Sequence, residues 1–60
     1  MTDRLLKLAE VKEIVGMGHT WLYEQIKAGA FPAPVKLSEK ASRWRESEVN
    51  DWIAALDRAA

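Results

Sequence analysis

Four basic side chains between residues 36 and 45 have the type and spacing to bind a polyanion. Ammonium and guanidinium groups pair with phosphate oxygens, and several of them together release the counterions of a nucleic acid. The chain is neutral as a whole, but residues 27–45 carry five basic side chains against one acidic, and residues 46–60 carry four acidic against one basic. This polarity allows one positive face despite the neutral total. The candidate phosphate contacts are Lys36, Lys40, Arg43 and Arg45. The alternative is that these side chains are ordinary solvated surface residues that bind no ligand.

A second group of candidates lies between residues 19 and 25. Imidazole and hydroxyl groups bind phosphate, glutamine can pair with adenine, and glutamate can accept a hydrogen bond from the amino group of cytosine. The group comprises His19, Thr20, Trp21, Glu24 and Gln25. Trp21 leaves three roles open, namely a contact with DNA, an anchor for a partner protein and a place in the core. Solvated side chains are the alternative for His19 and Gln25.

Catalysis and cofactor binding find no support in these residues. The chain has no cysteine, and its single histidine cannot make a metal site alone. No Ser/His/Asp arrangement and no phosphate-cradling glycine loop is present. We therefore expect no enzyme and no cofactor. Apolar runs are far shorter than the roughly 20 residues of a membrane helix, and residues 1–4 do not begin a signal peptide. We expect a soluble, cytoplasmic protein.

Hydrophobic periodicity predicts two helices around the second group of candidates. Leu8, Val11, Ile14 and Val15 follow helical spacing, and glycine at positions 16 and 18 ends that helix. A second helix over residues 19–28 follows at once, capped by Thr20 or His19, with its buried side formed by Leu22, Tyr23 and Ile26. A short glycine-containing turn between two helices is the spacing of a helix-turn-helix, although a helical hairpin that only builds a core shares it.

The basic residues lie in a predicted β-hairpin. Two prolines exclude a helix over residues 31–34. Residues 35–37 and 42–45 alternate with period two, which predicts two paired strands. In this interpretation Val35, Leu37 and Trp44 point inward, and Lys36, Arg43 and Arg45 point outward.

A last helix is predicted to begin at Glu46 or Ser47. Its apolar stripe comprises Val49, Trp52, Ile53 and Leu56, and Trp44 and Trp52 are expected in the core. The tail over residues 57–60 should fray. Residues 4–8 form a short apolar lead-in, either a brief strand or an extended arm. The predicted fold is mainly α with a small β-hairpin: one winged helix-turn-helix domain over residues 1–60, with three helices and a two-stranded wing.

Several segments together resemble one known family. They are Arg4-Leu5-Leu6, residues 11–17, residues 22–37 with the run IKAGAFPAPVKL, and residues 44–53 with WRESEV followed by WI. The chain is similar to the AlpA-type prophage transcriptional regulators, relatives of the excisionase and MerR-like winged helix-turn-helix group.

The resemblance implies a double-stranded DNA-binding protein that acts near prophage or integrated-element genes. Such proteins activate transcription of recombination genes, or bend DNA as excision factors that help an integrase. The second helix would read the major groove, and the hairpin would touch the backbone or minor groove. We expect a monomer or weak dimer that binds DNA cooperatively, with integrase or RNA polymerase as further partners.

The chain departs from the family at the start of the second helix. The family has a pattern like Ser-Arg-Ser-Thr where this chain has residues 18–21, and a basic residue where it has Glu24. Together with Trp21 and the neutral total charge, this departure motivates a rival hypothesis. In the rival hypothesis the winged fold has lost DNA reading and serves as a protein-interaction module.

Overall fold

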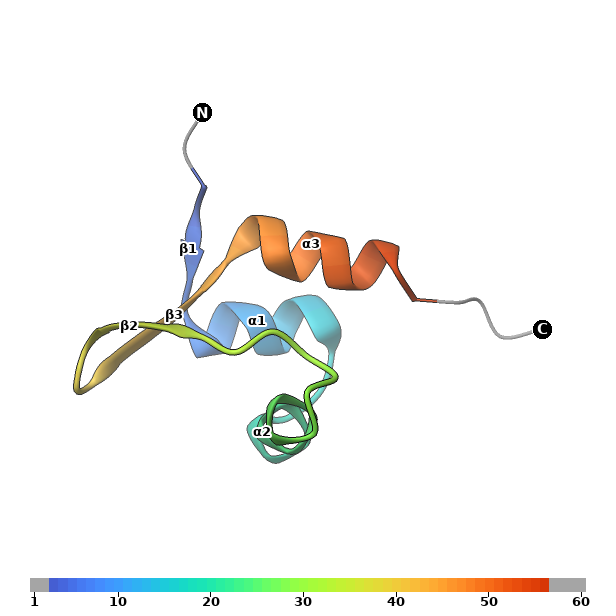
Figure 1. Ribbon diagram of the computed structural model, residues 1–60, viewed down its shortest axis with the longest axis horizontal. Helices are drawn as coiled ribbons and strands as arrows, with labels where there is room; N and C mark the ends of the chain where they lie inside the picture. Colours follow the sequence, from blue (N-terminus) through green and yellow to red (C-terminus); the bar gives the residue numbers. More distant parts are fainter. Residues whose placement is uncertain (1–2, 57–60) are drawn as a thin grey trace.

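The computed structural model describes residues 3–56 as three helices and a three-stranded antiparallel sheet (Figure 1). The predicted winged helix-turn-helix fold is confirmed, and the expected fraying of residues 57–60 lies outside the described residues. In chain order the elements are β1 (Leu5–Leu6), α1 (Leu8–Val15), α2 (His19–Lys27), β2 (Val35–Ser38), β3 (Ala41–Arg45) and α3 (Glu46–Ala54).

The turn between α1 and α2 contains residues 16–18 alone. Gly16 has a positive φ of 74° and donates its backbone N–H to the carbonyl of Lys12, which ends α1. Gly18 is the N-cap of α2, and its extended backbone places His19 and Thr20 inside the helix. The prediction that Thr20 or His19 caps α2 is therefore wrong. The cap position falls on Gly18 because the helix already begins at His19, and glycine is among the residues that N-cap positions accept.

The apolar lead-in is a strand that pairs with β3. Leu5 lies opposite Arg45 and Leu6 lies opposite Trp44, so the sheet order is β1-β3-β2. The backbone N–H of Glu46 donates to the carbonyl of Arg4 at 2.8 Å, which extends this pairing to the start of α3. The strand alternative for residues 4–8 thus holds at Leu5 and Leu6, and the sheet has one strand more than the predicted hairpin.

The register of β2 on β3 differs from the prediction. Val35 lies opposite Arg43 and Lys36 lies opposite Ser42, with an irregularity between Lys36 and Ser38. Directly opposite residues share a face of the sheet. Val35 therefore lies on the face of Arg43, and Leu37, at the irregularity, is 58% exposed. The prediction that both point inward with Trp44 is wrong, because sequence alternation reveals neither the register nor a bulge.

The core takes a buried side chain from nearly every element. Trp44 is 1% exposed and donates its Nε1–H to the carbonyl of Pro32 at 3.0 Å, so its predicted place in the core is confirmed. Trp44 of β3 thus anchors the sheet to the helices, whereas β2 contributes no buried residue and projects from the body (Figure 1). The cluster of buried residues comprises Leu6, Val11, Leu22, Phe31, Trp44 and Val49.

The apolar stripe of α3 is buried only in part. Trp52 is half-buried, and its ring lies edge-on to that of Phe31, with the ring centroids 4.8 Å apart. Its Nε1–H donates to the carbonyl of Ala30 at 2.7 Å. Ile53 and Leu56 are exposed, as is Ile14 of α1. A domain of this size has too little interior to cover every apolar position of three helices.

Candidate nucleic-acid interface

Helix α2 lies at the edge of the molecule with one long side open. Its contacts are mainly with α1, and Figure 1 shows it end-on below that helix. Leu22 is fully buried, and its neighbours Trp21, Gln25 and Ile26 are half-buried. The open side therefore runs along the positions spaced i, i+3, i+4 and i+7 from residue 20. We call these residues the α2 stripe: Thr20, Tyr23, Glu24 and Lys27, all exposed.

The predicted contacts in α2 divide between the open side and the core side. His19, Thr20 and Glu24 are exposed, as a contact with a ligand requires. Gln25 is half-buried beside the core side. Trp21 packs against the core and lies edge-on to Trp52, with ring centroids 6.4 Å apart. Of the three roles left open for Trp21, the structure shows the packing role.

Tyr23 and Lys27 are members of the α2 stripe that sequence reasoning did not select. Tyr23 was expected mostly in the core, but it is 43% exposed, and its ring lies edge-on to Trp44 at 6.4 Å. The expectation is wrong because Leu22 alone occupies the inward direction at that point of the helix. Helical spacing counted from Thr20 would have found both residues.

The N-termini of α1 and α3 are covered by carboxylates from within the molecule. Glu10 accepts the backbone N–H of Lys7 at 2.9 Å, and this hydrogen bond is the main reason that the pKa of Glu10 lies below its ordinary value. Asp3 accepts the backbone N–H of Ser47 at 3.1 Å and its hydroxyl at 2.7 Å, which lowers the pKa of Asp3. A negative charge at the N-terminus of a helix interacts favourably with the helix dipole, so each carboxylate stabilises its helix.

The N-terminus of α2 has no such cover among residues 3–56. Gly18 has no side-chain acceptor, no side chain caps the helix, and the first turn holds no acidic residue. The backbone N–H groups of the first turn have no partner in the preceding turn of a helix, so they can donate to an external anion. Exposed His19 and Thr20 flank them.

The hairpin formed by β2 and β3, here called the wing, carries unpaired cations. Lys36, Lys40 and Arg45 are exposed, and Arg43 is half-buried, with its guanidinium donating to the carbonyl of Ser42 at 2.8 Å. Ion pairs within residues 3–56 join Arg4 to Glu10 and Arg4 to Glu46, so none involves the wing.

The register distributes the wing cations over both faces. Arg43 and Arg45 share one face of β3, while Lys36 lies opposite Ser42 on the other face. The prediction that Lys36, Arg43 and Arg45 point the same way is therefore wrong, for the reason of register given above. A ribbon with cations on both faces can meet phosphates on two sides.

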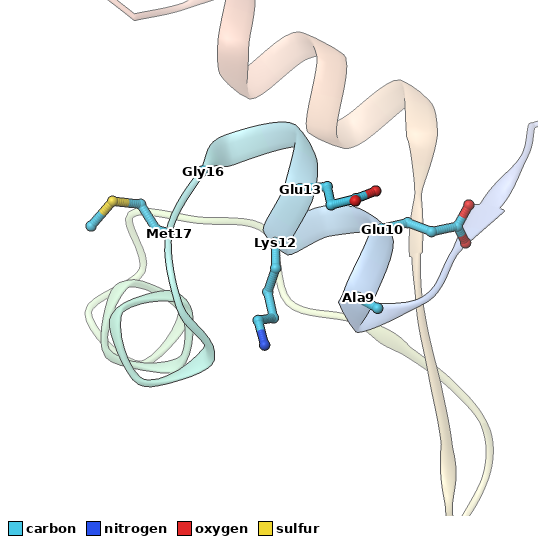
Figure 2. A pocket seen from close by; sticks show the side chains of 6 residues that line it. All are labelled: Ala9, Glu10, Lys12, Glu13, Gly16 and Met17. Carbon is cyan, nitrogen blue, oxygen red and sulfur yellow. The ribbon is translucent and has the colours of Figure 1, made fainter.

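The surface of residues 3–56 also carries a hollow outside α2 and the wing. A shallow, open hollow lies along the outer side of α1, where the Lys12 side chain points away from those of Glu10 and Glu13 (Figure 2). In the described part of the chain, no group of three or more His, Cys, Asp or Glu side chains could hold a metal ion. No helix there is long and apolar enough to cross a membrane.

The order of elements, the open second helix and the basic wing define a winged helix-turn-helix domain. Residues 4–58 match the family described as prophage CP4-57 regulatory protein (AlpA). The chain therefore belongs to the AlpA family of prophage regulatory proteins, and the resemblance found in the sequence is confirmed.

One relative of the chain comes from a bacteriophage. It is the uncharacterized protein ORF88 of Enterobacteria phage P4, which is 38% identical over 52 residues. The match covers 87% of this chain and 59% of the relative, so the chain spans less than two thirds of that protein's length. No solved structure matches the chain significantly.

Proposed function

We propose that this chain binds double-stranded DNA and regulates transcription of a prophage or integrated element. The observation that carries the proposal is the open side of α2, which joins the α2 stripe to a helix N-terminus without an internal carboxylate. The regulatory role named in the family description supports the same function. Such a role places the protein in the cytoplasm, where bacterial DNA lies.

In this proposal α2 enters the major groove while α1 supports it from behind. The N-terminal residues of a recognition helix contact base edges, and its first backbone N–H groups meet a phosphate. His19 and Thr20 lie at that end and Glu24 lies one turn further on. Lys27, at the far end of the stripe, is placed to meet the backbone on leaving the groove.

The wing lies over the adjacent backbone or in the minor groove. Its four cations are Lys36, Lys40, Arg43 and Arg45, and their distribution over both faces suits a groove that has a phosphate chain on each side. Half-buried Gln25 is a weaker base contact than the α2 stripe, because its position beside the core limits its reach.

Transcription regulation is favoured over a role in excision or in protein binding alone. The family description names regulation and does not mention excision. The rival hypothesis of a protein-interaction module relied partly on an exposed Trp21, and the packing of Trp21 against Trp52 weakens it. One module buries only roughly 600–1,000 Å² of protein surface on DNA. High affinity therefore calls for cooperative binding of monomers or weak dimers, or for integrase or RNA polymerase beside them.

An NMR amide titration tests the proposal directly. A generic duplex of about 20 base pairs, roughly two helical turns, is added at low and then at physiological salt. We expect salt-sensitive shifts clustered on residues 18–27 and 36–45, because phosphate contacts dominate non-specific binding. Shifts confined to α3, or no shifts at either salt, would overturn the assignment of these two contact elements.

A further inference from the structure

Glu24 is an unpaired carboxylate near the middle of the α2 stripe. It is exposed, and none of the ion pairs or side-chain hydrogen bonds found within residues 3–56 involves it. Lys27 follows it by three residues without forming an ion pair. The other exposed members of the stripe that flank it carry no negative charge. Glu24 is therefore the single anion of the α2 stripe, the surface that the proposed function places in the major groove.

A carboxylate in this position penalises most base pairs. Phosphates repel it wherever it approaches a duplex, and the major-groove edges of guanine and thymine present only acceptors to it. The amino donor of adenine lies between two acceptors, its own N7 and O4 of the paired thymine, whereas the N4 amino group of cytosine has an acceptor on one side alone, O6 of the paired guanine. A carboxylate that loses its hydration at the interface and finds no hydrogen-bond donor there pays the full desolvation penalty in binding free energy. The chemistry thus disfavours guanine and thymine most strongly and favours cytosine over adenine.

The surrounding packing fixes the side of α2 on which Glu24 lies. Leu22 is buried in the core, and the Tyr23 ring lies edge-on to Trp44, so rotation of α2 about its axis is blocked on the side of β3. Thr20 lies one turn before Glu24 on the same open side. A fixed helix face gives a single side chain a defined base position to read.

We propose that Glu24 determines the DNA sequence preference of this chain by accepting a hydrogen bond from the N4 amino group of one cytosine in the major groove. The assignment rests on the proposed function and adds the base that the recognition helix selects. Glu24 contributes through selectivity and not through overall affinity, because a wrong base leaves its charge unpaired.

Selection from a randomised duplex library tests the assignment with the full chain and with Glu24→Gln and Glu24→Ala. We expect the native chain to enrich cytosine at one position, with a preference of roughly 5- to 150-fold over other bases. Glutamine should shift that position toward adenine, with which it pairs bidentately. Alanine should abolish the preference there and bind mixed-sequence DNA more tightly, since the repulsion by phosphate is lost. The control variant Glu13→Gln removes an equal charge at an exposed position of α1 and should leave the preference for cytosine unchanged.

The outcomes separate this assignment from the proposed function. If the native chain binds duplexes but both Glu24 variants enrich the same sequence, or if it binds without any preference, the assignment to Glu24 fails and duplex binding stands. If the native chain binds no duplex at any salt concentration, the proposed function and the assignment fail together.

Discussion

The N-termini of α2 and α3 share one backbone geometry and differ in what covers them. The N-cap residues Gly18 and Arg45 are both extended, with φ of −77° and −72°. At α3, Asp3 reaches across from the start of β1 and accepts two hydrogen bonds from Ser47. At α2, residues 3–56 supply no side-chain cap. The difference indicates that α3 is stabilised from within, while α2 keeps its donors open for an external anion.

The largest effect should come from removing Trp44, the side chain that packs near both the α2 helix and the strand leading to the α3 cap. Trp44 contacts Tyr23 of α2 and lies opposite Leu6 of the strand that leads from Asp3. We expect Trp44→Ala to lower the free energy of unfolding by about 3–5 kcal/mol, enough to unfold much of a domain this small. Chemical denaturation followed by circular dichroism measures it. Trp44→Phe keeps a ring and should cost less; equal losses in both variants would show that the indole hydrogen bond to Pro32 matters more than its volume.

Charge reversal in the wing should weaken DNA binding while leaving the α2 N-terminus unchanged; Arg45 is also the N-cap of α3. Arg43→Glu combined with Arg45→Glu should lower affinity on the order of 100-fold for all sequences alike and reduce the salt slope by about 2. Fluorescence anisotropy over a range of salt concentrations measures both quantities. The matched Arg43→Lys, Arg45→Lys variant keeps the charge and should bind nearly as well. Unchanged DNA affinity after the charge reversal would contradict the proposed contact between the wing and DNA.

Converting the α2 N-terminus to the α3 arrangement should separate stability from binding. No atom lies within 4 Å of a Cβ placed on Gly18, so Gly18→Asp fits the fold. The new cap should raise the free energy of unfolding by roughly 0.5 kcal/mol. The same carboxylate should lower DNA affinity roughly tenfold by opposing phosphate. Gly18→Asn caps without charge and should lose less affinity. If the aspartate variant binds DNA as tightly as the native chain, the α2 N-terminus does not face a phosphate.

The smallest effect should come from removing the Asp3 carboxylate that caps the N-terminus of α3. Hydrogen bonds from Ser47 lower the pKa of Asp3 below its ordinary value of 3.8. The ionised cap therefore stabilises the fold above that value, and the contribution disappears as the pH falls through the lowered pKa. Asp3→Asn should lower stability slightly near neutral pH and flatten this acid dependence, with DNA binding unchanged. Thermal unfolding against pH measures it, with Asp51→Asn, an exposed carboxylate of α3, as the control. Identical profiles in the native chain and Asp3→Asn would exclude the cap.

Local patterns predicted the elements better than they predicted which side chains are exposed. Helical spacing and two glycines located α1, the turn and α2, because these signals depend on neighbours within a few residues. The same spacing placed Tyr23 on the buried side of its helix and Ile14 on the apolar face of the first helix, yet both are exposed. Burial depends on which other elements reach a given helix face, and a small domain leaves part of every face uncovered.

The exposure of the candidate residues in α2 was predicted only in part. His19, Thr20 and Glu24 lie on the open side of α2 as the interpretation required. Trp21 packs inward, and Tyr23 and Lys27 replace it on the stripe. The rotation of α2 about its axis decides this, and Leu22 fixes that rotation by entering the core.

The sequence by itself determined the two helices around a glycine turn, the proline break, the location of the two wing strands and the charge polarity along the chain. These are properties of short segments, so local backbone preference and periodicity are sufficient. Only the tertiary structure decided the pairing of β1 with β3, the register that divides the wing cations, and the cap that Asp3 supplies to Ser47, 44 residues away. Each of these joins segments that are distant in sequence, and their geometry follows from how the shared core around Trp44 packs.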